Sequence, residues 1–307
     1  MTRPRIVIAL DPQRVAPEAI ELGHALGVAT GAPLTLLAVW HRWEPVELAM
    51  LAGQSLREEA DEVLRAVGDR LRTRGHDVVE RVRAAGSVGS GLYAAGQYER
   101  TGLLVLGPAH RGGIARVLVG STAVGFLHGA PCPVAVAPRE YCAPQGALGR
   151  IGVAFADTED GQEALRGAAA LACRTGAQLR ILTVAELGVP PEALVMAGYG
   201  VQELLTDRHE AAERATERAV ESLPKGIDVE PVVIDGDPVS ALATASTDLD
   251  LLVCGSRSYG PLGAVMFGSV SRPLLHRAAS PLLVIPRGRE RRLESLLENS
   301  STAGLAR

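Results

Sequence analysis

The stretch LLVLGPAHRGGIARVLVGSTAVGFLHGAPCPVAVAPR, residues 103–139, occurs a second time as LLVCGSRSYGPLGAVMFGSVSRPLLHRAASPLLVIPR, residues 251–287. The two stretches align at a constant offset of 148, and 15 of the 37 aligned pairs are identical. The identities include glycines, prolines and a Gly-Ser pair, so the turns repeat together with the apolar segments. The chain therefore contains two copies of one folding unit.

The repeat extends toward the start of each copy. There the offset is 145, and it pairs residues 5–6 with 150–151 and residues 30–32 with 175–177. The change in offset places three additional residues in the middle of the second copy. We expect a first domain over residues 1–140, a linker over 141–149, a second domain over 150–288 and a C-terminal tail over 289–307.

Apolar patterning gives the same order of elements in both copies. Short continuous apolar runs are typical of strands that are covered on both faces, and amphipathic segments between them indicate helices. The predicted strands are 6–10, 34–39, 78–84, 103–106 and 133–137, then 151–155, 179–184, 229–234, 251–254 and 282–285; the predicted helices are 16–30, 55–74, 90–99 and one from 121, then 160–175, 201–222, 238–247 and one from 269. This alternation predicts an α/β fold with two repeated doubly wound parallel five-stranded sheets and helices on both faces. Sites are expected at the carboxyl ends of the strands.

The charge balance excludes several classes of function. The 31 basic and 35 acidic residues leave a net charge of −4, which does not favour nucleic acid or an anionic membrane as a partner. The single lysine, Lys225, stands in the sequence Leu-Pro-Lys-Gly, so the chain has no Walker A loop. Paired acids, a nucleophile beside a base and an H-x-x-H spacing are all missing from the sequence. An enzyme is therefore a weaker interpretation than a binding protein.

The cysteines and the apolar runs bear on the compartment. None of the cysteines forms a C-x2-C pair, and we expect reduced, buried thiols in a cytoplasmic protein. The apolar run that ends at Leu10 is too short for a signal peptide. The uncharged stretch 117–138 is interrupted by glycines and prolines, so no membrane span is expected. The four cysteines are Cys132, Cys142, Cys173 and Cys254.

Glycines follow the fourth predicted strand of each copy. A dinucleotide-binding fold has its glycines after the first strand, where this chain has Asp-Pro-Gln-Arg at 11–14. Here Gly107 and Gly255 end the fourth strands, and Gly120-Ser121 and Gly268-Ser269 open the last helices. A glycine after a strand permits an unusual backbone turn, and Gly-Ser at a helix start offers N–H groups and a hydroxyl to a phosphate. The alternative is that these pairs only cap helices.

This loop resembles the motif G-x2-G-x9-G-[S/T] of the universal stress protein family in its tandem two-domain form. The resemblance covers nearly all of residues 3–287 and implies an adenine nucleotide alpha hydrolase-like fold that binds ATP, with or without Mg²⁺. In that family the loop holds the phosphates and ribose, while an aspartate ending the first strand and a valine ending the second address the ribose and adenine. The residues implied are Asp11, Val39, Gly107, Gly120 and Ser121 in the first copy and Val184, Gly255, Gly268 and Ser269 in the second.

The chain also departs from this motif. His110 and Ser258 stand where the second glycine belongs, which makes a positive φ costlier there. Ala156 occupies the aspartate position of the second copy, and Asp157 follows it. Because a strand reverses its side-chain direction at each residue, Asp157 takes over that role only if the strand end bends. His110, Arg257 and Ser258 are the candidate phosphate contacts in the two loops.

These features favour a cytoplasmic, non-enzymatic stress-response protein whose ATP sites sense nucleotide occupancy and change the surface shown to a protein partner. The alternatives are a scaffold that binds no nucleotide and an enzyme that hydrolyses ATP slowly. The segments 133–138 and 281–286 are bounded by prolines, which is typical of an edge strand that pairs once. The resemblance implies that these strands join the copies as an internal pseudo-dimer with an approximate two-fold axis. A homodimer of chains is also expected.

Overall fold

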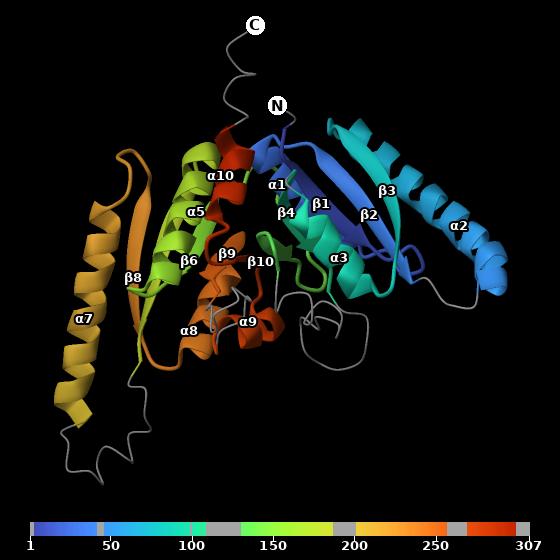
Figure 1. Cartoon of the computed structure of the whole chain (residues 1–307). Helices are drawn as coiled ribbons and strands as arrows, with labels where there is room; N and C mark the ends of the chain where they lie inside the picture. The colour runs from blue at the N-terminus through green and yellow to red at the C-terminus, as the bar shows by residue number, and fades with distance from the viewer. Residues whose placement is uncertain are drawn as a thin grey trace, which may run out of the picture.

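The computed structural model describes residues 3–41, 46–98, 100–108, 130–186, 201–256 and 269–298. Within these ranges strands and helices alternate along the chain in the predicted order (Figure 1). The α/β class predicted from the apolar patterning is therefore confirmed.

The first copy provides strands β1 to β5 with three described helices. Its last predicted helix, from residue 121, lies outside the described residues. The elements are β1 (Arg5–Leu10), α1 (Pro17–Thr30), β2 (Leu34–His41), α2 (Val46–Thr73), β3 (Val78–Ala85), α3 (Val88–Gln97), β4 (Thr101–Leu106) and β5 (Val134–Val136).

The second copy repeats this series with an additional short 3₁₀ helix, and its last helix is described. The elements are β6 (Arg150–Phe155), α5 (Glu159–Thr175), β7 (Gln178–Ala185), α7 (Val201–Glu221), β8 (Val229–Asp235), α8 (Pro238–Ala245), a short 3₁₀ helix (Ser246–Asp248), β9 (Leu251–Gly255), α9 (Ser271–Arg277) and β10 (Leu282–Ile285). The prediction that the last helix opens at Ser269 is wrong. Ser269 lies in the turn before α9, whose N-cap residue is Val270 and lacks a side-chain cap.

The strands of both copies form one ten-stranded sheet, in the order β3-β2-β1-β4-β5-β10-β9-β6-β7-β8. Each half is parallel, and the halves meet through the antiparallel pair β5–β10, in which Ala135 lies opposite Leu283. The strand order is symmetric about this pair, as an approximate two-fold axis requires. Figure 1 shows the two halves as wings of the one sheet. The expected internal pseudo-dimer is confirmed, and the two predicted sheets are continuous.

The prediction that the last strand is an edge that pairs once is wrong. β5 pairs with β4 on one side and with β10 on the other, so it lies in the interior of the sheet. The prolines are tolerated because they lie outside the three paired residues of β5. Pro133 uses its carbonyl group, which accepts the N–H of Leu104 at 3.0 Å, and Pro281 accepts from Leu252 in the same way at 2.9 Å.

Apolar side chains on the two faces of the sheet form two separate clusters. The first cluster joins the sheet to α1, α2, α5 and α7 and contains fully buried residues from both copies, such as Ile8 and Ile151. The second joins the opposite face to α3, α8 and α9, with Leu104 and Leu252 at its centre. Successive strand residues alternate between these clusters, and the pleat of the sheet produces this alternation.

A repeated Thr-Gly-Ala sequence ends the first helix of each copy. Gly31 and Gly176 adopt φ of 61° and 72°, the left-handed conformation that glycine tolerates best at a helix C-terminus. The hydroxyl of Thr30 donates to the carbonyl of Leu26 at 2.7 Å, and it accepts the N–H of Ala32 at 3.2 Å. The repeat thus marks a helix end that leads directly into the second strand.

The segment assigned to the C-terminal tail begins with a further helix, α10 (Glu290–Glu298), which lies beside α5 (Figure 1). This helix belongs to the second copy by sequence but packs against β4 of the first. Leu296 is 1% exposed and covers Gly102 of β4. The Arg292 guanidinium donates hydrogen bonds at 2.7, 3.1 and 3.2 Å to the carbonyls of Gly96, Tyr98 and Thr101.

Candidate functional site

A cavity of about 170 Å³ lies at the carboxyl ends of β6, β7 and β9 in the second copy. It is therefore at the edge of the sheet where doubly wound folds bind ligands. Two residues predicted for this site, Val184 and Gly255, line it. The other lining residues are Ala154, Phe155, Ala156, Thr158, Asp160, Gly161, Leu182, Glu186, Pro238, Leu242, Cys254, Val270 and Ser271.

Gly255 is required because the first turn of α5 packs directly on the end of β9. A Cβ at Gly255 would lie 2.8 Å from the carbonyl carbon of Asp160, and a Cβ at Gly161 would lie 3.0 Å from that of Ala156. Neither glycine has a positive φ. The predicted reason for Gly255, an unusual backbone turn, is therefore wrong. This glycine serves the close approach of a strand end to a helix start.

Burial sets the chemistry of a hydroxyl group and a thiol group in the cavity wall. The Ser271 Oγ is buried and has no hydrogen-bond partner among the described residues. A buried hydroxyl without a partner is unfavourable, so this atom is suited to accept or donate a bond to a ligand. Burial raises the pKa of the Cys254 thiol to about 12, so the cysteine presents a neutral, weakly polar surface.

The acidic position of the motif is altered in the second copy, as the sequence indicates. Ala156 lines the cavity, whereas Asp157 does not. The Asp157 carboxylate accepts a hydrogen bond from Arg218 of α7 at 2.7 Å, and this bond holds its pKa below the usual value. Asp157 is thus engaged away from the cavity. Thr158 follows it and caps α5 by accepting the N–H of Gly161 at 3.2 Å.

The described part of the first copy places three predicted residues at the same sheet edge. Asp11 follows β1 and is exposed, and its carboxylate accepts the N–H of Gln13 at 3.0 Å. Val39 lies in β2 and packs on the second apolar cluster. Gly107 follows β4, and a Cβ there would lie 2.6 Å from the Cβ of Ala16. Gly107 therefore serves the same close packing as its counterpart in the second copy.

Comparison with known proteins identifies the family. The model of the universal stress protein family matches the chain twice, over residues 2–138 and 148–286. The chain belongs to the universal stress protein family. A universal stress protein of Mycobacterium tuberculosis is 30% identical over 297 residues, which cover 92% of this chain and 99% of that one. A second one from the same species is 29% identical over 59% of this chain and 61% of its own length.

Solved structures show that this universal stress protein shares its fold over nearly its whole length with other chains. One from Archaeoglobus fulgidus superposes with a TM-score of 0.68 at 19% identity, covering 94% of this chain and 100% of the other. A putative universal stress protein from Pseudomonas aeruginosa gives 0.62 at 19% identity and covers 98% of both chains. The adenine nucleotide alpha hydrolase-like fold implied by the resemblance is consistent with these neighbours.

Half of the predicted site residues of this universal stress protein lie outside the described ranges. They are His110, Gly120, Ser121, Arg257, Ser258 and Gly268. Ser269 is described, in the turn before α9. The structure therefore brings Val184 and Gly255 together in one cavity, and ATP, Mg²⁺ and their contacts remain predictions.

Several residues of the cavity were not predicted from the sequence. Thr158 could have been found, because it precedes two acidic residues and an apolar run, which is the pattern of a helix start. The same holds for Asp160 in that first helical turn. Glu186, Leu242 and Ser271 belong to three different elements, and nothing in their local sequence separates them from ordinary surface or core residues.

Three further findings on this universal stress protein concern membrane spans, metal ligands and thiols. Among the described residues, no helix is long and apolar enough to span a membrane. The part of the chain that the structure describes holds no cluster of three or more potential metal ligands. The four cysteines are free, but only Cys132 and Cys254 are buried, so the expectation that the thiols are buried is wrong for Cys142 and Cys173.

Proposed function

We propose that this universal stress protein is a sensor of adenine nucleotide occupancy, and that ATP binds in the cavity of the second copy. The observation that carries the proposal is this cavity. Val184 and Gly255 line it as the family motif requires, and its wall contains the Ser271 hydroxyl, which has no hydrogen-bond partner among the described residues. A protein partner would then distinguish the occupied state from the empty one.

The dimensions and chemistry of the cavity support the base and ribose as its occupants. The apolar side chains of Leu182, Val184 and Leu242 suit the faces of an adenine ring. About 170 Å³ is less than the roughly 300–1,000 Å³ of a typical small-molecule site, so the described walls enclose only part of a nucleotide. The sequence motif assigns the phosphates to Gly268 and Ser269.

The acidic residues of the cavity favour binding of the magnesium complex. Asp160 and Glu186 line the cavity, and its described lining contains no lysine or arginine. Bare phosphates would meet the two carboxyl groups of like charge there. Mg²⁺ is bound through one or two carboxylates together with phosphate oxygens, which makes MgATP the species we expect.

The test is calorimetric titration of ATP, with and without Mg²⁺, into protein freed of bound ligand. Ala154→Phe places a ring in the cavity, and Ala9→Phe makes the same change at the equivalent strand position of the first copy. We expect Ala154→Phe to abolish the heat of binding and Ala9→Phe to retain it, with both variants folded by circular dichroism. The absence of heat in the wild-type protein would instead indicate a nucleotide-independent scaffold.

A second pair of variants tests the hydroxyl. Ser271→Ala is expected to weaken binding by about twofold to tenfold, the worth of one hydrogen bond. Ser280 also has a buried Oγ with no partner among the described residues, but it does not line the cavity. Ser280→Ala is therefore the matched control, and equal effects of the two changes would argue against the proposed contact. ATP turnover that Ala154→Phe abolishes would show an enzyme rather than a sensor.

The assembly of the chain is a separate part of the proposal. We expect a homodimer in the cytoplasm. Light scattering coupled to gel filtration measures its mass directly, and a mass equal to one chain at micromolar concentration would contradict it.

A further inference from the structure

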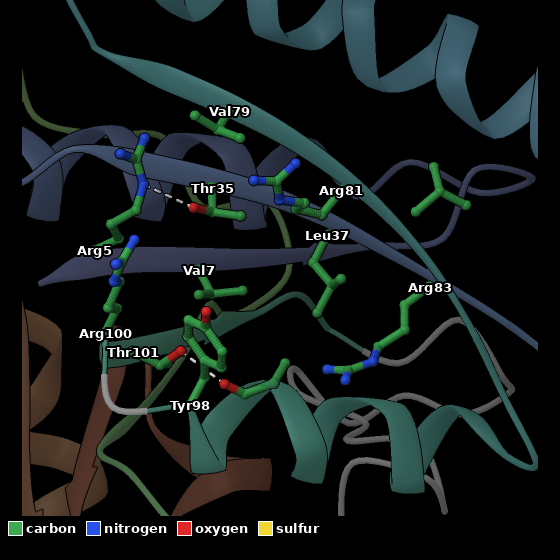
Figure 2. A pocket seen from close by; sticks show the side chains of 12 residues that line it. Arg5, Val7, Thr35, Leu37, Val79, Arg81, Arg83, Tyr98, Arg100 and Thr101 are labelled. Carbon is green, nitrogen blue, oxygen red and sulfur yellow. Dashed lines mark hydrogen bonds between the residues drawn. The ribbon is translucent and has the colours of Figure 1, made fainter. Parts of the chain in front are cut away.

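A second, larger groove lies on the first copy, on the sheet face that carries α3 (Figure 2). Its volume is about 560 Å³, within the range of small-molecule sites. The side chains of Val7 and Leu37 lie in its middle, with Arg5 and Arg100 toward one end and Arg81 and Arg83 toward the other (Figure 2). None of the residues proposed for nucleotide binding lines this groove.

The groove has an excess of positive charge. Arg81 and Arg83 alternate along β3 with residues that face α2, so both project on the α3 side of the sheet. These two side chains and Arg100 make no hydrogen bond or ion pair with any described residue. The described lining contains no carboxylate. Among the described contacts of the four groove arginines, the pair of Arg5 with Asp77 at 3.4 Å is the only one with a carboxylate.

The equivalent face of the second copy lacks these charges. In the β2–β3 pair, Leu37 lies beside Arg81 and Val39 beside Arg83. In the β7–β8 pair, the counterparts Leu182 and Val184 lie beside Val232 and Ile234. The same sheet positions thus carry cationic side chains in the first copy and apolar side chains in the second.

In the second copy, side chains also fill the positions that correspond to the groove near Thr35 and Val7. Arg180 occupies the position of Thr35 and is paired with Glu230 at 2.9 Å. Leu249 packs over Gly152, where a Cβ would lie 3.3 Å from the Leu249 Cδ2. The fold therefore requires neither the groove nor the two arginines of β3.

Several cations on one sheet face repel one another, and the repulsion is relieved when an anion binds between them. We propose that the groove of the first copy binds a small organic phosphate with at least two negative charges. Its phosphate oxygens contact Arg81, Arg83 and Arg100, and its less polar body lies on Val7 and Leu37. This site is independent of the nucleotide cavity of the second copy.

The spacing of the arginines fits a ligand of this size. Arg5 and Arg81 are separated by two strand intervals and by four residues along the strands. Standard sheet dimensions place their Cα atoms about 16 Å apart. The Arg5 guanidinium is held at its own end of the groove by the Thr35 hydroxyl at 2.9 Å and by Asp77 at 3.4 Å, so the groove between it and Arg81 is available to the carbon body of the ligand.

The probes are inorganic diphosphate and geranyl diphosphate, titrated calorimetrically into the full-length protein at low salt. The apolar body should make geranyl diphosphate bind more tightly than inorganic diphosphate. The double variant Arg81→Gln/Arg83→Gln should weaken both by at least tenfold, because two charge-assisted contacts are lost. Arg100→Gln, in the turn before β4, should weaken both as well.

The matched control changes two exposed arginines on the other side of the sheet, Arg65→Gln/Arg70→Gln on α2, which alters the net charge equally. This control and Ala154→Phe should leave diphosphate binding unchanged. An equal loss of diphosphate binding in the control variant would show that only the net charge matters, which would overturn the proposal.

Two further outcomes would overturn it. The first is binding of hexaglutamate without binding of either diphosphate, which would indicate a surface for an acidic peptide. The second is self-association of Arg81→Gln/Arg83→Gln without any diphosphate binding by the wild type. In that case the arginines serve only to protect the edge strand β3 from pairing with another chain.

Discussion

The contact between α10 and β4 permits a test of how the two copies are joined. A Cβ added to Gly102 would lie 2.7 Å from both Cδ atoms of Leu296, which no real contact allows. Leu296 is 1% exposed and packs in the first apolar cluster. Each residue therefore occupies space that the other leaves free.

The magnitudes follow from this geometry. Gly102→Ala overpacks the contact and is expected to lower the free energy of unfolding by about 1–3 kcal/mol. Leu296→Ala removes the terminal carbons and leaves a cavity, which costs about 2–5 kcal/mol. In the double variant the new methyl group enters that cavity. Its loss should be smaller than the sum of the single losses by about 0.5–3 kcal/mol, the range for residues in contact.

Urea unfolding followed by circular dichroism measures the three variants against the wild type. The control is Gly149→Ala with Leu296→Ala, because a Cβ at Gly149 meets only the Asp250 carboxylate, at 3.5 Å, and should behave additively. Additivity within about 0.5 kcal/mol for the Gly102 pair would refute the packing of α10 on the first copy.

The remaining predictions concern other parts of the chain. The ring nitrogens of His24 and His76 lie 2.6 Å apart, and burial lowers the pKa of both, which favours their neutral forms. The free energy of unfolding should therefore fall as the pH drops below about 6.5. His76→Gln should flatten the dependence of the urea midpoint on pH. An unchanged slope would exclude the pair as its source. Burial raises the pKa of the Cys132 and Cys254 thiols to about 12, so a thiol reagent should modify only the two exposed cysteines before denaturation. Rapid modification of all four cysteines in the native protein would contradict this. Arg292→Met should lower the free energy of unfolding by about 1.5–3 kcal/mol through the loss of its bonds to carbonyls, whereas a change under 0.5 kcal/mol would assign those bonds no role.

The internal repeat was sufficient to predict most of the fold. Because residues 103–139 and 251–287 share their turn residues, the two copies had to share one topology, and the alternation of strands and helices gave parallel sheets. The Thr-Gly-Ala helix ends repeat for a local reason, since the left-handed glycine and the threonine hydroxyl act within a few residues. Local signals of this kind are present in the sequence itself.

The candidate site was predictable only in part. Val184 and Gly255 follow from the strand ends and the family motif, and both line the cavity. Glu186, Leu242 and Ser271 come from separate elements, and their meeting depends on how α8 and α9 pack on the sheet. The reason for Gly255 was also misjudged, because a clash with Asp160 cannot be inferred from one strand alone.

The sequence by itself determined that the chain is a duplicated α/β unit, since periodicity and turn chemistry act over short distances along the chain. The family resemblance implied which strands join the copies, and only the tertiary structure decided the direction of their pairing and where the copies differ. Antiparallel pairing of β5 with β10, the docking of α10 on β4 and the four arginines of one groove all depend on residues brought together from distant segments. Such contacts are set by packing and charge in three dimensions, and no local pattern encodes them.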